Sequence, residues 1–237
     1  MLDVSLFGQR AFLGVQLATF CLGAGMFALF PFISIYLQDI DGNTPLGAGL
    51  RFLPITAFVF LVPLVTRNLA ARTSMRLLLS VSLAISAVGV LLMANISVGS
   101  SWTALLPGFI VTGIGIGLAN PTIAGAALRV VDPARTGMAS GISNTCRVGG
   151  LAVGVAVLGA ALQTRVGDHL SAAGYHGRGI AASVSSSGLR AAHGQAGLLS
   201  VANAAFVSGF RLVLLIGCLT LVVGAAAAAL LVRQPAG

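Results

Sequence analysis

Six long stretches of hydrophobic residues alternate with short polar segments along the chain. Each stretch holds at least the roughly 20 residues that a helix needs to cross about 30 Å of hydrocarbon. Backbone polar groups inside a membrane must be hydrogen-bonded within the protein, and this requirement favours helices for single segments. The pattern therefore predicts an all-α, polytopic membrane protein, folded as one six-helix bundle over residues 1–237. The expected spans are residues 11–37, 46–66, 77–98, 102–128, 137–162 and 212–232.

Composition agrees with this prediction and excludes other protein classes. Hydrophobic residues make up 57% of the chain and charged residues only 8%, which is far from the composition of a soluble domain. A net charge of +8 on a soluble surface would suggest nucleic acid as a partner. Here the arginines lie between the hydrophobic stretches, so we expect a lipid bilayer as the partner and no nucleic acid.

The distribution of arginine predicts the orientation of the helices. The short segments 38–45 and 99–101 carry no basic residue, and both lie on the same side of the membrane in a six-helix arrangement. Basic residues accumulate on the cytoplasmic side of membrane proteins. We therefore expect a multi-pass protein of the cytoplasmic membrane with both termini in the cytoplasm. The arginines assigned to that side are Arg10, Arg67, Arg72, Arg76, Arg129, Arg135 and Arg233.

One long polar segment, residues 163–210, is expected outside the membrane between the fifth and sixth spans. Its Ala, Gly and Ser content fits either a mobile lid or a small helical hairpin. It contains all three histidines, His169, His176 and His193, whose spacings match no zinc site. The sequence therefore predicts no metal and no cofactor.

Small residues form a stripe along the fourth span. Gly113, Gly117, Pro121 and Gly125 recur every four residues, so they share one face of a helix. Small residues let a neighbouring backbone approach closely, and a proline inside a helix removes a hydrogen bond. The stripe is either a rigid packing seam or part of a conformational change.

Polar residues share one face of the fifth span. Ser140, Asn144 and Arg147 are spaced by four and three residues, between one glycine pair at Gly137 and Gly141 and another at Gly150 and Gly154. Arg147 lies about 15 Å along the helix from Gly137, where a charged side chain costs about 2.5–3.5 kcal/mol to insert. Arg147 is either a transport residue or a clamp that binds backbone carbonyls. Gln16 in the first span and Arg51 in the second are weaker candidates.

Two stretches resemble a known family. The first stretch runs from Leu106 through Asn120 to Pro121, and the second runs from Asp132 to Gly150. The second contains a pattern of one proline, two glycines and Asn-Thr-x-Arg, which begins at Pro133 and ends at Arg147. Both resemble the major facilitator superfamily, and within it the fourteen-helix drug:proton antiporters of the EmrB/QacA type. The resemblance implies a half-bundle of the facilitator fold, and it implies conformational or transport roles for Asn120, Pro121, Gly113 and Gly117.

The polar turn 66–76 is similar to the superfamily's basic cytoplasmic loop. Arg72 and Arg76 match its basic positions, whereas Ala71 and Ser74 stand where an Asp and a Gly are usual. A charge-relay latch of the kind attributed to that loop is therefore not expected here.

The resemblance implies that the chain is the carboxyl-terminal half of a secondary-active multidrug or antibiotic efflux transporter. Its substrates would be small, amphipathic and often cationic, and a missing amino-terminal half or another transporter chain would complete it. Every acidic residue is expected in a tail or loop, so a proton-carrying carboxylate would have to come from that partner. These residues are Asp3, Asp39, Asp41, Asp132 and Asp168. The alternative is a non-transporting scaffold left by a truncated gene, and nothing in the sequence favours an enzyme.

Overall fold

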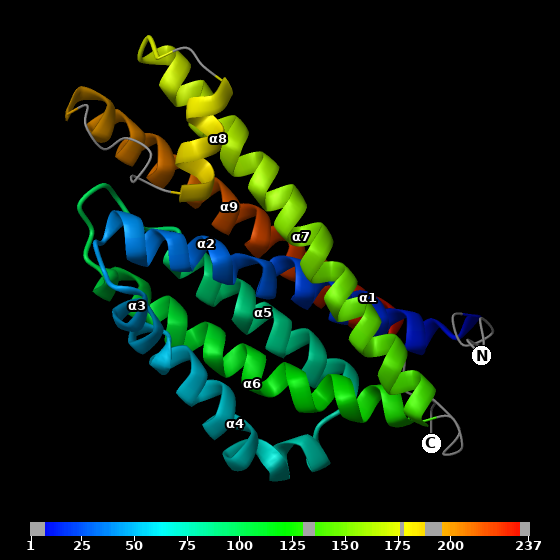
Figure 1. Cartoon of the computed structure of the whole chain (residues 1–237). Coiled ribbons are helices and arrows are strands. Elements are labelled where there is room, and N and C mark those ends of the chain that lie inside the picture. The colour runs from blue at the N-terminus through cyan, green and yellow to red at the C-terminus, as the bar shows by residue number, and fades with distance from the viewer. Residues whose placement is uncertain (1–7, 130–135, 176–177, 188–195, 233–237) are drawn as a thin grey trace.

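The computed structural model describes residues 8–129, 136–175, 178–187 and 196–232, with side chains described except at 67–72, 127–129, 178–181, 187 and 196–197. The described residues are helical apart from short turns (Figure 1). The α-helices are α1 Arg10–Gly25, α2 Phe30–Ile35, α3 Pro45–Arg51, α4 Leu53–Arg72, α5 Met75–Met93, α6 Leu106–Arg129, α7 Thr136–Ala172, α8 Arg178–Ser187 and α9 Ala196–Leu231. Shorter helical turns are η2 Phe27–Leu29, η3 Tyr36–Ile40 and η4 Trp102–Leu105.

Six segments of the described chain are long and apolar enough to cross a membrane. They are Arg10–Ile40, Pro45–Thr66, Met75–Met93, Trp102–Ala126, Thr136–Ala172 and Leu198–Leu231. The predicted all-α fold with six spans is therefore confirmed.

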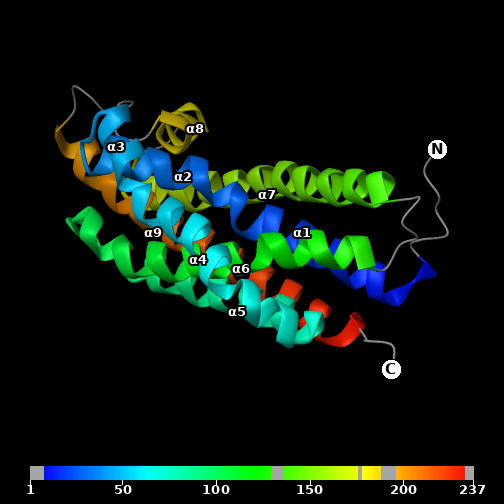
Figure 2. The same cartoon turned by 90° about the horizontal axis from the view of Figure 1, so that it is seen from below.

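The helices pack as an elongated bundle in which α9 has a central place. It contacts α1, α5 and α7, while α6 packs against α4 and α5 on the other side. The start of α1, the end of α6, the start of α7 and the end of α9 lie at one end of the bundle (Figure 2). We call this the terminal end, and we call the other end, which carries the turn between α2 and α3, the turn end.

The first span is not one continuous helix. Pro31 has no backbone N–H, and its ring conflicts with the carbonyl four residues earlier, so an α-helix cannot run through it unbroken. Accordingly α1 ends at Gly25, a short 3₁₀ turn follows, and α2 begins with Pro31 in its first turn. The span then closes with the π-helical turn η3, which contains Asp39. The prediction that Asp39 lies in a loop is thus wrong, because the helical structure continues to Ile40.

The last two helices extend well beyond the spans expected from hydropathy. Residues 163–210 were predicted as an extramembrane segment, but α7 continues to Ala172 and α9 begins at Ala196. The physical reason is a continuous apolar stripe at four-residue spacing on α7, which packs on α9. Its buried members are Leu158, Leu162, Val166 and Leu170. At 1.5 Å per residue α7 is about 55 Å long, so it must project beyond the hydrocarbon.

The segment between these two helices is also partly helical. The short helix α8 packs on α7 and buries Val184 (Figure 1). Of the two structures considered for this segment, a helical one is therefore the better match. His176 and His193 lie outside the described residues.

Candidate functional site

A polar pocket of about 290 Å³ opens between α1, α6 and α7. Its lining combines amide, hydroxyl and guanidinium groups with the apolar side chains of an isoleucine and an alanine. The lining residues are Thr19, Asn120, Ile123, Ala124, Ser140, Ser143, Asn144 and Arg147. Four residues singled out from the sequence, Asn120, Ser140, Asn144 and Arg147, thus come together from two helices.

The pocket lies about a third of the way along α7 from the terminal end of the bundle. Arg147 is eleven residues into α7, and Asn120 is nine residues before the end of α6. At 1.5 Å per residue these positions are about 16 Å and 14 Å from the terminal end. This depth is close to the middle of a hydrocarbon layer about 30 Å thick.

Arg147 is held in the pocket by its own helix. Its Nη2 donates a hydrogen bond of 2.9 Å to the side-chain oxygen of Asn144, one turn earlier. No ion pair to Arg147 occurs within the described part of the chain. The pocket therefore presents an uncompensated positive charge together with amides and hydroxyls, a set that can hydrogen-bond acceptor groups of a ligand.

Gln16 contacts one of the residues that line the pocket. Its side chain is buried, and its Nε2 donates a hydrogen bond of 3.0 Å to the hydroxyl of Ser143, joining α1 to α7. Thr19, one turn further along α1, donates to the carbonyl of Val15 at 2.7 Å. Gln16 does not line the pocket, and its hydrogen bond to Ser143 joins α1 to α7.

Glycines allow α1 and α7 to touch through their backbones. A Cβ at Gly23 would clash with the Arg147 carbonyl oxygen, and one at Gly150 with the Phe20 carbonyl oxygen. A Cβ at Gly154 would lie 2.6 Å from the carbonyl oxygen of Ala24. The predicted packing role thus applies to Gly150 and Gly154. A Cβ at Gly137 or Gly141 would meet no described atom within 4 Å, so these two glycines make no such contact within the described part of the chain.

Gly113 and Gly117 of the α6 stripe pack against α4, and Gly125 lies nearest to Met75 of α5. A Cβ at Gly113 would lie 2.7 Å from the Ile55 carbonyl oxygen, and one at Gly117 would lie 3.0 Å from that of Phe58. Pro121 lies inside α6 and is exposed beside the pocket.

Sequence reasoning missed a second glycine seam, between α5 and α6. Gly89 and Gly115 lie against Thr112 and Ser86 across this seam, and Gly108 lies against the carbonyl of Gly89. The signal in the sequence was weak because these glycines do not share one regular spacing.

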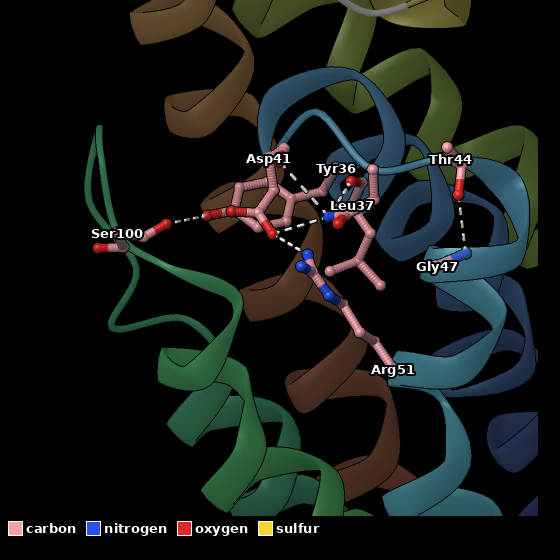
Figure 3. Close-up of polar contacts among 8 residues, drawn as sticks. Tyr36, Leu37, Asp41, Thr44, Gly47, Arg51 and Ser100 are labelled. Carbon is pink, nitrogen blue, oxygen red and sulfur yellow. Dashed lines mark hydrogen bonds and ion pairs between the residues drawn. The ribbon is translucent and has the colours of Figure 1, made fainter.

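A cluster of polar contacts closes the turn end of the bundle (Figure 3). Arg51 at the end of α3 forms an ion pair with Asp41. The Asn43 amide donates 2.8 Å hydrogen bonds to the Asp41 carboxylate and to the Leu37 carbonyl. The Arg51 guanidinium also lies 5.0 Å from the ring centroid of Trp102. Arg51 therefore connects the first, second and fourth spans, as a residue that joins helices would.

Tyr36 connects the turn end to Ser100 and to α9. Its hydroxyl donates to the carbonyl of Ser100 at 3.3 Å (Figure 3). Its ring stacks on Phe210 of α9, with centroids 5.2 Å apart. Sequence reasoning missed the contacts of Asp41 and Tyr36, although Asp41 lies in the short segment 38–45 and Arg51 follows that segment closely, so a pairing could have been inferred.

Of the two arginines of the basic turn, Arg76 does not line the pocket. Arg76 is exposed in the first turn of α5, at the terminal end. Arg72 ends α4, and its side chain lies outside the described residues.

The sequence model of the Major Facilitator Superfamily matches residues 3–155, which is more than half of the chain. The chain belongs to the Major Facilitator Superfamily. Among its relatives is a methylenomycin A resistance protein of Streptomyces coelicolor, 29% identical over 74% of this chain. Two others are the multidrug resistance protein Stp of Mycobacterium tuberculosis, 33% identical over 68%, and the multidrug efflux pump LfrA of Mycolicibacterium smegmatis, 31% identical over 67%.

The aligned segments cover only part of each relative. They span 37%, 30% and 32% of the lengths of these three proteins, so the chain corresponds to about a third of each. Membership of the superfamily and six apolar spans make the chain a multi-pass membrane protein of a transporter family, which is generally non-enzymatic.

The backbone contact between α1 and α7 predicts that two glycine-to-alanine changes on α7 differ in their effect on stability. Gly150→Ala places a Cβ against a backbone carbonyl, so we expect a loss of about 1–3 kcal/mol in stability from overpacking. Gly141→Ala is the matched control, because its Cβ points into open space. The measurement is thermal unfolding in detergent. Equal melting temperatures for the two variants would contradict the close contact.

Proposed function

We propose that this chain is the carboxyl-terminal six-helix half of a multidrug or antibiotic efflux transporter of the fourteen-helix drug:proton antiporter type. In this proposal the pocket between α1, α6 and α7 forms one wall of the substrate site. The relatives named for antibiotic resistance, multidrug resistance and multidrug efflux support a drug as substrate. The resemblance to the antiporter family implies that this drug is small and amphipathic. Facilitators alternate access around a site near the membrane midplane, and the depth of the pocket fits that location.

The observation that carries the proposal is the exposure of polar side chains about 15 Å from the terminal end of the bundle. Ser140 and Asn144 are exposed, and Arg147 is partly exposed, on a face that lies at the depth of the hydrocarbon. Polar and charged groups at this depth face a bundle interior or a water-filled cavity and not lipid. A second bundle that covers this face would supply both the cavity and the opposite wall of the site.

Proton coupling would require a group that this wall does not contain. None of the residues that line the pocket is acidic. The acidic side chains that the structure describes, Asp39, Asp41 and Asp168, lie on elements at the turn end. We therefore place the proton-carrying carboxylate on the partner half, and we expect the chain alone to perform no proton-driven transport.

The proposed orientation puts the terminal end in the cytoplasm. It rests on the arginines assigned to that side and on the absence of basic residues from segments 38–45 and 99–101. Reporter fusions after Asn43 and after Gly237 should then label opposite sides of the cytoplasmic membrane. A cytoplasmic reporter at Asn43 would overturn the orientation.

Reconstituted transport tests the function directly. We expect no uptake of a fluorescent cationic dye into liposomes with a pH gradient when the chain is present alone. Co-reconstitution with the amino-terminal half of a family member should produce uptake that a protonophore abolishes. Arg147→Ala should reduce this uptake about 10- to 100-fold, the effect of losing a charged hydrogen bond worth about 1.5–3 kcal/mol. Arg147→Lys should restore it only partly, because an ammonium lacks the planar donor fork.

The matched control is Arg10→Ala, an exposed arginine at the start of α1 and outside the pocket. It should leave uptake unchanged. Normal uptake by Arg147→Ala at normal expression would remove Arg147 from the site. Proton-driven uptake by the chain alone would refute the requirement for a partner carboxylate. Absence of uptake with every amino-terminal half tested would favour a non-transporting scaffold protein.

A further inference from the structure

A second, larger pocket lies near the turn end of the bundle and has no place in the proposed transport path. It is a groove of about 630 Å³ along α9, bordered by α7 on one side and by the turn after α5 on the other. Its polar lining includes Arg165, Ser208, Arg211 and Ser97, and its apolar lining includes Leu212 and Leu215. Arg165 and Arg211 were expected in the extramembrane segment, but both lie on helices.

The groove has an excess of positive charge. Arg165 Nε donates to the hydroxyl of Ser208 at 3.3 Å, and that hydroxyl lies 2.9 Å from Nε2 of His169. These contacts tie Arg165 to α9 without neutralising it. Neither Arg165 nor Arg211 forms an ion pair within the described part of the chain. The neighbouring Asp168 is exposed and is not part of the groove lining.

The face of α9 below Arg211 is apolar and uncovered. Leu215, Leu219 and Val222 follow Arg211 at helical spacing on its side of the helix, and Leu230 lies further along on the adjoining face. Their side chains are 47%, 63%, 48% and 72% exposed, respectively. A charged end and an apolar stripe therefore lie in line on one helix.

The position of Arg211 along α9 matches the boundary of a membrane. Arg211 precedes the end of α9 at Leu231 by twenty residues, which is about 30 Å of helix. This length equals the thickness of the hydrocarbon core. When the end of α9 lies at one membrane surface, Arg211 lies at the level of the lipid headgroups on the other.

We propose that the groove binds the phosphate group of an anionic phospholipid, with an acyl chain along the apolar stripe of α9. Arginine suits this ligand because its planar donors match phosphate oxygens in pairs. The hydroxyls of Ser97 and Ser208 supply neutral hydrogen-bonding groups beside the two charges. Bound lipid would rest on α7 and α9 together and so stabilise their contact at the turn end.

Native mass spectrometry of the full chain, delipidated in detergent, tests the proposal. With equal amounts of phosphatidylglycerol and phosphatidylcholine, we expect the chain to retain phosphatidylglycerol preferentially. Arg211→Gln should weaken this binding about fivefold, and Arg165→Gln with Arg211→Gln about 25-fold, because each arginine near an anionic headgroup contributes about 1 kcal/mol, which is about fivefold in affinity. Arg211 has no described hydrogen bond, so the single variant should change lipid binding without changing the stability of the fold.

The matched control is Arg10→Gln with Arg76→Gln, which removes two exposed arginines at the terminal end. It should leave phosphatidylglycerol binding unchanged, and equal loss in this control would overturn the proposal. Retained binding in the Arg165 and Arg211 double variant would also overturn it. A third arm adds glycerol 3-phosphate as a competitor. Displacement of the lipid at equal concentration would assign the site to a soluble phosphate compound and overturn the lipid assignment, whereas resistance to displacement supports it.

The apolar part of the proposal has its own test. Leu215→Ser with Leu219→Ser should weaken phosphatidylglycerol binding while leaving the two arginines in place. Binding that is unaffected by this change would contradict the path proposed for the acyl chain.

Discussion

The contact between the backbones of α1 and α7 is the constraint on which the candidate site depends. In a membrane, lipid chains are as apolar as the helix surfaces, so helices associate through close van der Waals packing and hydrogen bonds. Gly23, Gly150 and Gly154 provide that packing by removing every side-chain atom from the line of contact. The same contact brings Gln16 within hydrogen-bonding distance of Ser143, and it places Thr19 in the wall that contains Arg147.

The charged groups in the pocket and at the turn end differ in whether their charge is neutralised. The Arg51 and Asp41 side chains are less than one quarter exposed, and they neutralise one another, so their cluster joins helices. Arg147 has only the neutral amide of Asn144 as its described partner. An unneutralised charge at mid-depth is stable only when water or another polar surface covers it. This difference is why we assign ligand contact to the pocket and a structural role to the cluster.

Residue spacing predicted the elements well because each span satisfies its own backbone hydrogen bonds, so hydropathy and length suffice to find it. The same spacing predicted that Ser140, Asn144 and Arg147 share a face. It did not predict the ends of α7 and α9, because Leu158 to Leu170 are buried by contact with another helix, and hydropathy averages hide a stripe flanked by polar residues. Nor did it separate Gly150 from Gly141, since both look alike in sequence and only the neighbouring helix distinguishes them. Pro31 accounts for a break in the first span, but the sequence did not show that α1 ends at Gly25, where it lies close to Gly217 of α9.

The central claim is that substrate contacts the pocket between α1, α6 and α7. Protection of an introduced thiol measures this contact directly. In a chain whose native cysteines Cys21, Cys146 and Cys218 are replaced by alanine, Ser140→Cys would be alkylated by a maleimide in the presence of the amino-terminal half. Thr164→Cys, exposed on α7 far from the pocket, serves as the control. The account predicts that an exported drug slows alkylation at position 140 and leaves it unchanged at position 164. Equal alkylation at position 140 with and without saturating drug would contradict it.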